Sequence, residues 1–112
     1  MAKYLILIFR DEKAETPVTV GPVDPAYLDF MERHAGALLN GGALESTETA
    51  TSVRRDDAGG FLITDGPFAE SKEALGGYYL IEAADLDEAL EIAKDVPAPH
   101  GGVEVRPVWV AS

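Results

Sequence analysis

The sequence predicts an α+β fold, in which helices cover a single face of one sheet. Three observations indicate it: an unbroken apolar strand at residues 4–9, two amphipathic helices at 25–40 and 86–96, and short strands between and after them. The chain has 112 residues, the usual size of one domain. We therefore expect a single domain over residues 1–112.

The composition excludes several classes of function. With 20 acidic against 9 basic side chains the formal charge is −11, which repels phosphate backbones and disfavours nucleic-acid binding. There are no cysteines, so disulfides, thiolate catalysis and Cys-ligated zinc are excluded. No stretch reaches the length of a membrane span, and the apolar run at residues 4–9 is too short for a signal peptide. We expect a cytoplasmic protein.

The first strand is apolar on both faces. Side chains alternate along a strand, so one face carries Leu5, Leu7 and Phe9 and the other carries Tyr4, Ile6 and Ile8. Both faces must therefore be covered.

The first helix follows a polar loop at residues 10–23. Asp24 and Pro25 are typical of an N-cap and a first turn. Apolar side chains at helical spacing predict a helix over 25–40, which Asn40-Gly41-Gly42 ends.

A hairpin is predicted next. Residues 43–54 are rich in threonine and indicate a strand, residues 55–60 supply Asp and Gly for the connection, and residues 61–64 return. Gly66-Pro67 breaks this strand, and residues 69–75 have room for one or two helical turns.

The last part of the chain repeats strand, helix and strand. Residues 78–81 form a strand that is again apolar on both faces, with Gly76-Gly77 as turn glycines before it. A capping box, Asp85 to Glu88, begins a helix over 86–96. The last strand starts at Val103 and continues to Trp109, and Pro107 places it at a sheet edge.

This order is the ferredoxin-like βαββαβ arrangement with one extra hairpin strand. Two helices cover only one face of such a sheet. The other apolar face therefore predicts a homodimer with the two sheets face to face.

The stretch from Asp65 to Tyr79, DGPFAESKEALGGYY, combines a turn, acids, a base and a strand start. It resembles the signature of YCII-related proteins of the DGPF type, and the resemblance extends from Tyr4 to Pro107. It implies a dimeric α+β barrel, with Asp65, Glu70, Lys72 and Glu73 in the site region.

Asp65 has two interpretations. Its carboxylate either accepts backbone N–H groups in an Asx-type turn or faces a pocket as a base or ligand acceptor. Glu70, Lys72 and Glu73, taken singly, are typical of solvated loop residues. Only the resemblance marks them as site residues, where Lys72 would pair with an acid or meet an anionic ligand.

Two arginines extend this candidate site. Arg54 precedes the hairpin connection, and Arg106 lies in Glu104-Val105-Arg106-Pro107, which is similar to the family's last strand. Arginine suits bidentate contacts with carboxylates or phosphates. Either these residues brace the sheet through ion pairs, or they share an anion site with the loop at Asp65.

Histidines and aromatic residues complete the candidates. His34 on the first helix is a candidate partner of Asp65 in a catalytic dyad, and His100 lies in a turn. Phe68 and Tyr79 are candidates for a pocket lining, with core packing as the alternative. The sequence shows no metal-binding or phosphate-loop motif, and no cofactor is expected.

Two functional hypotheses follow. The first is a metal-free binder of a small anionic molecule, or an acid–base enzyme, with its pocket near the loop at Asp65. The alternative is a regulatory module that partners an extracytoplasmic-function sigma factor, because DGPF-type proteins resemble partners of such factors.

Overall fold

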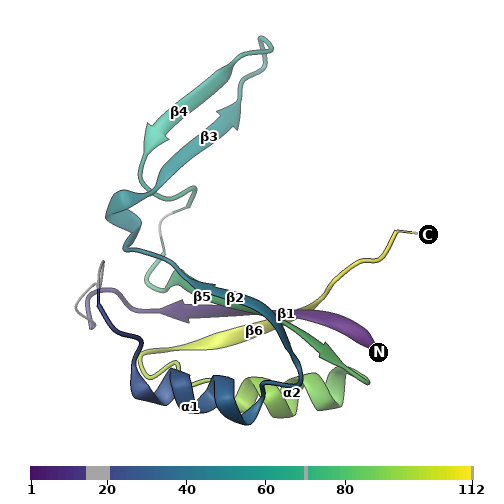
Figure 1. The fold of residues 1–112 in the computed structure, drawn as a ribbon. Coiled ribbons are helices and arrows are strands. Elements are labelled where there is room, and N and C mark those ends of the chain that lie inside the picture. Colours follow the sequence, from purple (N-terminus) through teal and green to yellow (C-terminus); the bar gives the residue numbers. More distant parts are fainter. Residues whose placement is uncertain (15–20, 70, 112) are drawn as a thin grey trace.

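The computed structural model describes residues 1–14, 21–69 and 71–111, which form a four-stranded sheet, two helices and a separate two-stranded hairpin (Figure 1). In chain order, the elements are β1 (Ala2–Arg10), α1 (Pro25–Arg33), β2 (Leu38–Ala43), the short 3-10 helix η1 (Thr47–Thr49), β3 (Thr51–Arg55), β4 (Phe61–Asp65), β5 (Ala74–Ala83), α2 (Leu86–Lys94) and β6 (Gly101–Pro107). The predicted α+β class is confirmed.

The four-stranded sheet has the strand order of a ferredoxin-like fold. The order is β2-β5-β1-β6, and each neighbouring pair is antiparallel. β6 lies at an edge, as Pro107 predicts, because an edge strand tolerates a residue without an N–H group. The expected extension to Trp109 is wrong, since β6 ends at Pro107.

The core lies between the sheet and the helices. Along β1, Tyr4, Ile6 and Ile8 are buried on the helix side, while Leu5, Leu7 and Phe9 are only half-buried on the other face. The rest of the core comes from Phe30 of α1, Tyr79, Ile81 and Ala83 of β5, Ala89, Ile92 and Ala93 of α2, and Val96. The predicted division of β1 into two faces is confirmed.

The first helix is shorter than predicted. It ends at Arg33, with His34 as the C-cap, and residues 38–43 form β2 instead of a last helical turn. Pairing with β5 overrides the helical spacing of Leu38. Glycine permits this pairing, because a Cβ at Gly41 would lie only 2.6 Å from Cδ1 of Tyr79.

The single strand predicted for residues 43–54 is also wrong. The Ser46 hydroxyl accepts from the N–H of Glu48 and begins η1, which separates β2 from β3. The Glu12 carboxylate holds this turn by accepting from the N–H of Thr47 at 3.0 Å. The addition to the ferredoxin-like core is therefore a hairpin of two strands, β3 and β4, which form their own sheet.

The segment after β4 departs from expectation as well. Its described residues form no helical turn before β5 begins at Ala74. Gly76 and Gly77 lie inside β5, next to an irregularity in its register with β1, instead of in a turn. At the other end of β5, Asp85 caps α2 as predicted, since its carboxylate accepts from the N–H of Glu88 at 2.9 Å. The Glu88 carboxylate accepts from the N–H of Ala84 and not from that of Asp85, so only half of the predicted capping box is present.

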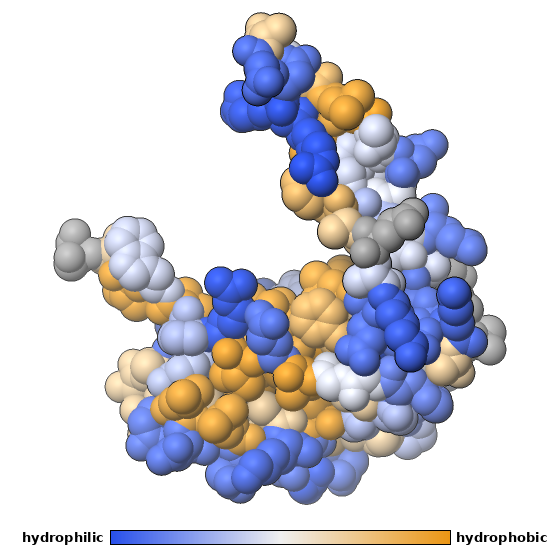
Figure 2. All heavy atoms as spheres, turned by 180° about the vertical axis from the view of Figure 1, so that it is seen from behind, coloured by the Kyte–Doolittle hydropathy of each residue, from blue (hydrophilic) through white to orange (hydrophobic). Residues whose placement is uncertain are grey.

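The hairpin and the C-terminal segment project from one side of the sheet. We call β3, β4 and their connection, residues 51–65, the arm, and residues 108–111 the tail. Both leave the sheet on the side opposite the helices, and space-filling shows a hollow between them (Figures 1 and 2). Neither helix in the described part of the chain is long and apolar enough to cross a membrane.

Candidate functional site

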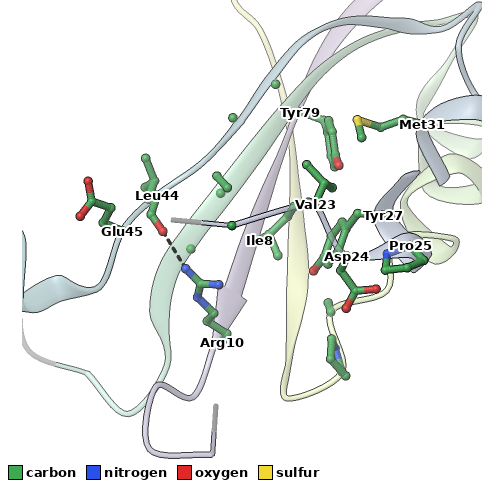
Figure 3. Close-up of a pocket in the computed structure, with 18 of the residues that line it drawn as sticks. Ile8, Arg10, Val23, Asp24, Pro25, Tyr27, Met31, Leu44, Glu45 and Tyr79 are labelled. Atoms are coloured by element: carbon green, nitrogen blue, oxygen red, sulfur yellow. Dashed lines mark hydrogen bonds between the residues drawn. The ribbon is translucent and has the colours of Figure 1, made fainter. Parts of the chain in front are cut away.

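A cavity of about 1120 Å³ lies between α1 and the β2–β5 edge of the sheet (Figure 3). Its described walls come from the ends of β1 and β2, the segment before α1, one side of α1, and residues 98–100. Ile8, Met31, Leu38 and Ala98 give it an apolar lining. The cavity therefore extends from the core to the edge of the sheet.

Four glycines in adjacent strands line this cavity. Gly41 and Gly42 belong to β2, Gly76 and Gly77 belong to β5, and all four line the cavity. A Cβ at Gly77 would lie 2.8 Å from the carbonyl oxygen of Gly42, so the two strands approach too closely for a side chain. The glycines thus make a floor of bare backbone.

Two tyrosines contribute phenol groups to the cavity, Tyr79 from β5 and Tyr27 from α1 (Figure 3). The Tyr79 ring packs against Phe30, with the ring centroids 5.0 Å apart. Burial, with a smaller contribution from Tyr27, raises the pKa of Tyr79 above its ordinary value. The Tyr79 phenol is therefore protonated near neutral pH and can donate a hydrogen bond.

Arg10 brings a positive charge to the end of the cavity where β1 and β2 terminate. Its Nη2 donates to the carbonyl oxygen of Leu44 at 2.7 Å (Figure 3). To reach it, the side chain crosses Gly76, where a Cβ would lie 2.5 Å from Nε of Arg10. Asp24 also lines the cavity, but its carboxylate caps α1 by accepting from the N–H of Ala26 at 2.8 Å.

The structure brings two of the predicted site residues together at the base of the arm. The Arg54 guanidinium lies 3.7 Å from the centroid of the Phe68 ring, and its Nη2 donates to the Phe68 carbonyl at 3.0 Å. Asp65 ends β4 opposite Thr51, and its carboxylate makes no hydrogen bond with any described residue.

The other predicted residues are dispersed. Among the predicted residues that the structure describes, Tyr79 and His100 line the cavity. Arg106 is exposed on β6, with Nη1 3.8 Å from Glu104. Lys72 and Glu73 are exposed, and Glu70 lies outside the described residues.

The predicted pairing of His34 with Asp65 is wrong. His34 Nε2 lies 2.8 Å from Oδ2 of Asp95, and the His34 ring packs against Phe30. The reason is the early end of α1, which places His34 beside Asp95, the C-cap of α2. Asp65 instead lies in the arm, on the side of the sheet away from the helices (Figure 1).

Sequence reasoning missed Arg10 and Tyr27. One signal was available for Arg10, a charged residue that directly follows an entirely apolar strand. A second was the presence of Gly41-Gly42 and Gly76-Gly77, which we assigned to a helix end and to a turn. In the part of the chain that the structure describes, no group of three or more His, Cys, Asp or Glu side chains is placed to hold a metal ion.

Comparison with known proteins assigns this chain to a family. The sequence model of the YCII-related domain matches residues 2–112. The chain belongs to the YCII-related family. A relative of this YCII-related domain, an uncharacterized protein of Rhizobium meliloti (strain 1021), is 49% identical over 115 residues, covering 94% of this chain and 90% of the relative. That relative's name adds no activity, so the function must be inferred from the geometry.

Proposed function

We propose that this YCII-related domain binds a small organic acid with an apolar body in the cavity between α1 and the β2–β5 edge. The observation that carries the proposal is the cavity itself, whose glycine backbone floor lies beside a protonated phenol and a guanidinium. The volume of about 1120 Å³ is of the order of known small-molecule sites.

The chemistry of the lining suggests how such a ligand would lie. The apolar body would pack on Ile8, Met31 and the Tyr79 ring, which exclude water from one side of the cavity. The carboxylate would lie near Arg10, whose planar guanidinium matches the two oxygens of a carboxylate. The Asp24 carboxylate, which also lines the cavity, is held at the start of α1 by the capping hydrogen bond from the N–H of Ala26.

A titration of the uniformly ¹⁵N-labelled protein tests this proposal. The probes are benzoate, phenylacetate and hexanoate, each paired with its neutral amide as a matched control. We expect the acids to shift the amide signals of Gly41, Gly42 and Gly77. Arg10→Gln should weaken binding about ten- to hundredfold, the usual effect of removing a charged hydrogen bond.

The control for this experiment is Lys94→Gln, which removes a positive charge from the exposed side of α2. It should leave affinity unchanged. If none of the acids shifts the cavity signals, or if Lys94→Gln weakens binding as much as Arg10→Gln, the proposed site is wrong.

A second proposal concerns the open face of the sheet, and the size of the accessible surface supports it. The accessible surface is 7954 Å², whereas a compact monomer of 11.9 kDa exposes about 5,900 Å². We propose that a second copy covers the excess, with Leu5, Leu7 and Leu80 at the centre of the contact. A stable homodimer requires a total buried surface of more than about 1,200 Å².

Sedimentation velocity over a dilution series tests the homodimer. We expect a dimer for the natural sequence and a monomer for Leu7→Glu, which places a charge on the open face. Leu90→Glu is the matched control, because Leu90 is an exposed leucine on α2. A monomer at every concentration of the natural sequence would contradict the proposal.

Two further predictions from the sequence stay predictions: the role of Asp65 as a catalytic base, and a sigma factor as a partner.

A further inference from the structure

One face of the arm is an exposed apolar surface. The register of β3 and β4 pairs Val53 with Ile63 and Arg55 with Phe61, so these four side chains lie on the same face. Val53 is 54% exposed, Phe61 59% and Ile63 66%. A two-stranded hairpin is marginally stable in water by itself, and its apolar face has no cover within the described subunit. The arm therefore needs a partner surface.

The tail is a second exposed apolar segment. Val108, Trp109 and Val110 follow β6, and Trp109 is 85% exposed. The N–H of Val108 still donates to the carbonyl of Lys3 at 2.9 Å, which fixes where the tail leaves the sheet. Like the arm, the tail is too apolar for a free surface segment.

The arm and the tail leave from opposite ends of the same face. Ala74, where the chain returns from the arm, pairs with Arg10 at the end of β1. Pro107, where the tail begins, pairs with Tyr4 near the start of β1. Six residues separate these positions on β1, a distance of about 20 Å along the strand. Both segments project on the side away from the helices (Figure 1).

We propose that the apolar face of the arm, Val53, Phe61 and Ile63, packs against the tail of a second copy. This inference rests on the homodimer proposed above. A two-fold axis that lies between the sheets and runs across the strands exchanges the two ends of the sheet. It brings each arm beside the partner's tail, so the contact forms twice.

The occupant is a second copy because one body then covers three surfaces at once: the sheet face, the arm and the tail. The extended shape agrees with this assignment. The radius of gyration is 16.0 Å, whereas a compact domain of 112 residues has about 13 Å. Two interlocked copies would make each arm part of a compact assembly.

Disulfide trapping tests the arm–tail contact without background, because the chain contains no cysteine. Ile63→Cys and Trp109→Cys are prepared separately, mixed under conditions that exchange subunits, and oxidised mildly. We expect the mixed disulfide to form at least tenfold faster than either homodisulfide. Lys94→Cys, on the exposed side of α2, is the control and should not cross-link with Ile63→Cys.

The outcomes separate the two proposals. A dimer in sedimentation whose Ile63→Cys subunits link only to each other overturns the arm–tail contact and leaves the homodimer intact. A dimer that forms no mixed disulfide does the same. A monomer at every concentration overturns both.

Fluorescence gives an independent measurement, since Trp109 is the chain's only tryptophan. Its emission should move to shorter wavelength as the protein concentration rises through the dimerisation range. Ile63→Lys should abolish that shift, and Leu90→Lys should not. An emission maximum that does not change with concentration, in a protein that dimerises, would overturn the contact.

Discussion

The four-stranded body and the arm are built from the same types of residue but are stabilised differently. In the body, Ile6, Phe30 and Ile81 are completely buried between sheet and helices. In the arm, the apolar side chains Val53, Phe61, Leu62 and Ile63 are all more than half exposed. The body is thus stabilised by burial within one subunit, whereas the arm depends on local hydrogen bonds and, in the homodimer that we propose, on the second copy.

Polar contacts at the two ends of the arm give it its shape. At its base, the Ser52 hydroxyl donates to the Gly66 carbonyl at 2.6 Å. At its tip, the Asp56 carboxylate accepts from the N–H groups of Ala58 and Gly60 at 3.0 and 2.8 Å. Such bonds orient a hairpin but each contributes only about 1 kcal/mol.

The largest expected effect is the difference in unfolding free energy between two phenylalanine substitutions. Phe30→Ala removes a fully buried ring and should lower the free energy of unfolding by about 3–5 kcal/mol. Phe61→Ala removes an exposed ring of the arm and should cost the isolated subunit less than about 1 kcal/mol. Urea unfolding at two protein concentrations measures both values.

Concentration distinguishes the origin of each loss. The cost of Phe61→Ala should grow as dimers form, because binding to a partner stabilises the folded state by mass action. The cost of Phe30→Ala should not change. Equal losses for the two variants at high dilution would mean that arm and body unfold as one unit, which would end the distinction.

In the body, the sequence alone was enough to predict those elements whose structure follows from a local pattern of residues. The apolar run at residues 4–9 forms β1 with the predicted faces, because alternation along a strand is a local property. Residues 38–43 were mispredicted because Leu38 also suits helical spacing, and only the contact with β5 selects a strand.

The candidate site was less predictable because its residues come from distant positions. Tyr79 was found as an aromatic residue of a strand, but Arg10 and Tyr27 join it only through the packing of β1 and α1 around the glycine floor. His34 has its carboxylate partner 61 residues away, at Asp95. Spacing along the chain contains no information about such pairs.

Two glycine substitutions, one in the body and one in the arm, should have intermediate effects on stability. Gly77→Ala places a Cβ 2.8 Å from the Gly42 carbonyl in the body, and should lower the free energy of global unfolding by about 1–3 kcal/mol. Gly59→Ala strains the arm's turn, where φ is 88°, by about 1–2 kcal/mol. We expect Gly59→Ala to leave global unfolding of the body unchanged.

Circular dichroism in urea measures the free energy of global unfolding of both variants. Gly36→Ala is the control, since nothing lies within 4 Å of its Cβ position. A loss from Gly59→Ala as large as that from Gly77→Ala would show that the arm contributes to the cooperative unit.

Alkaline pH should weaken the body through Tyr79. The pKa of its phenol is raised by burial, so the folded state binds this proton more tightly than the unfolded state. The resulting stability is fully present below about pH 10 and is lost as the pH rises through the folded pKa, by at most about 1.4 kcal/mol per pH unit. Unfolding of the natural sequence and of Tyr79→Phe, compared between pH 8 and 11, isolates this dependence.

Tyr79→Phe should have the flatter profile over that range. Its difference from the natural sequence is the informative quantity, because lysines and the other tyrosines titrate there too. Identical profiles would mean that Tyr79 is ionised as easily in the folded as in the unfolded state.

The smallest effect is expected at the base of the arm. Arg54→Gln removes both the stacking on Phe68 and the hydrogen bond to its carbonyl, contacts worth about 0.5–1 kcal/mol at an exposed site. Because the arm lacks a core of its own, this loss should appear as faster amide hydrogen exchange at Val53 and Ile63, while exchange at Ile6 and Ile81 is unchanged. Lys94→Gln is the control, since it removes a positive charge from the exposed side of α2 and leaves the contacts of the arm in place. If Arg54→Gln also accelerated exchange at Ile6, the arm would have to open together with the sheet, and its stability would belong to the body after all.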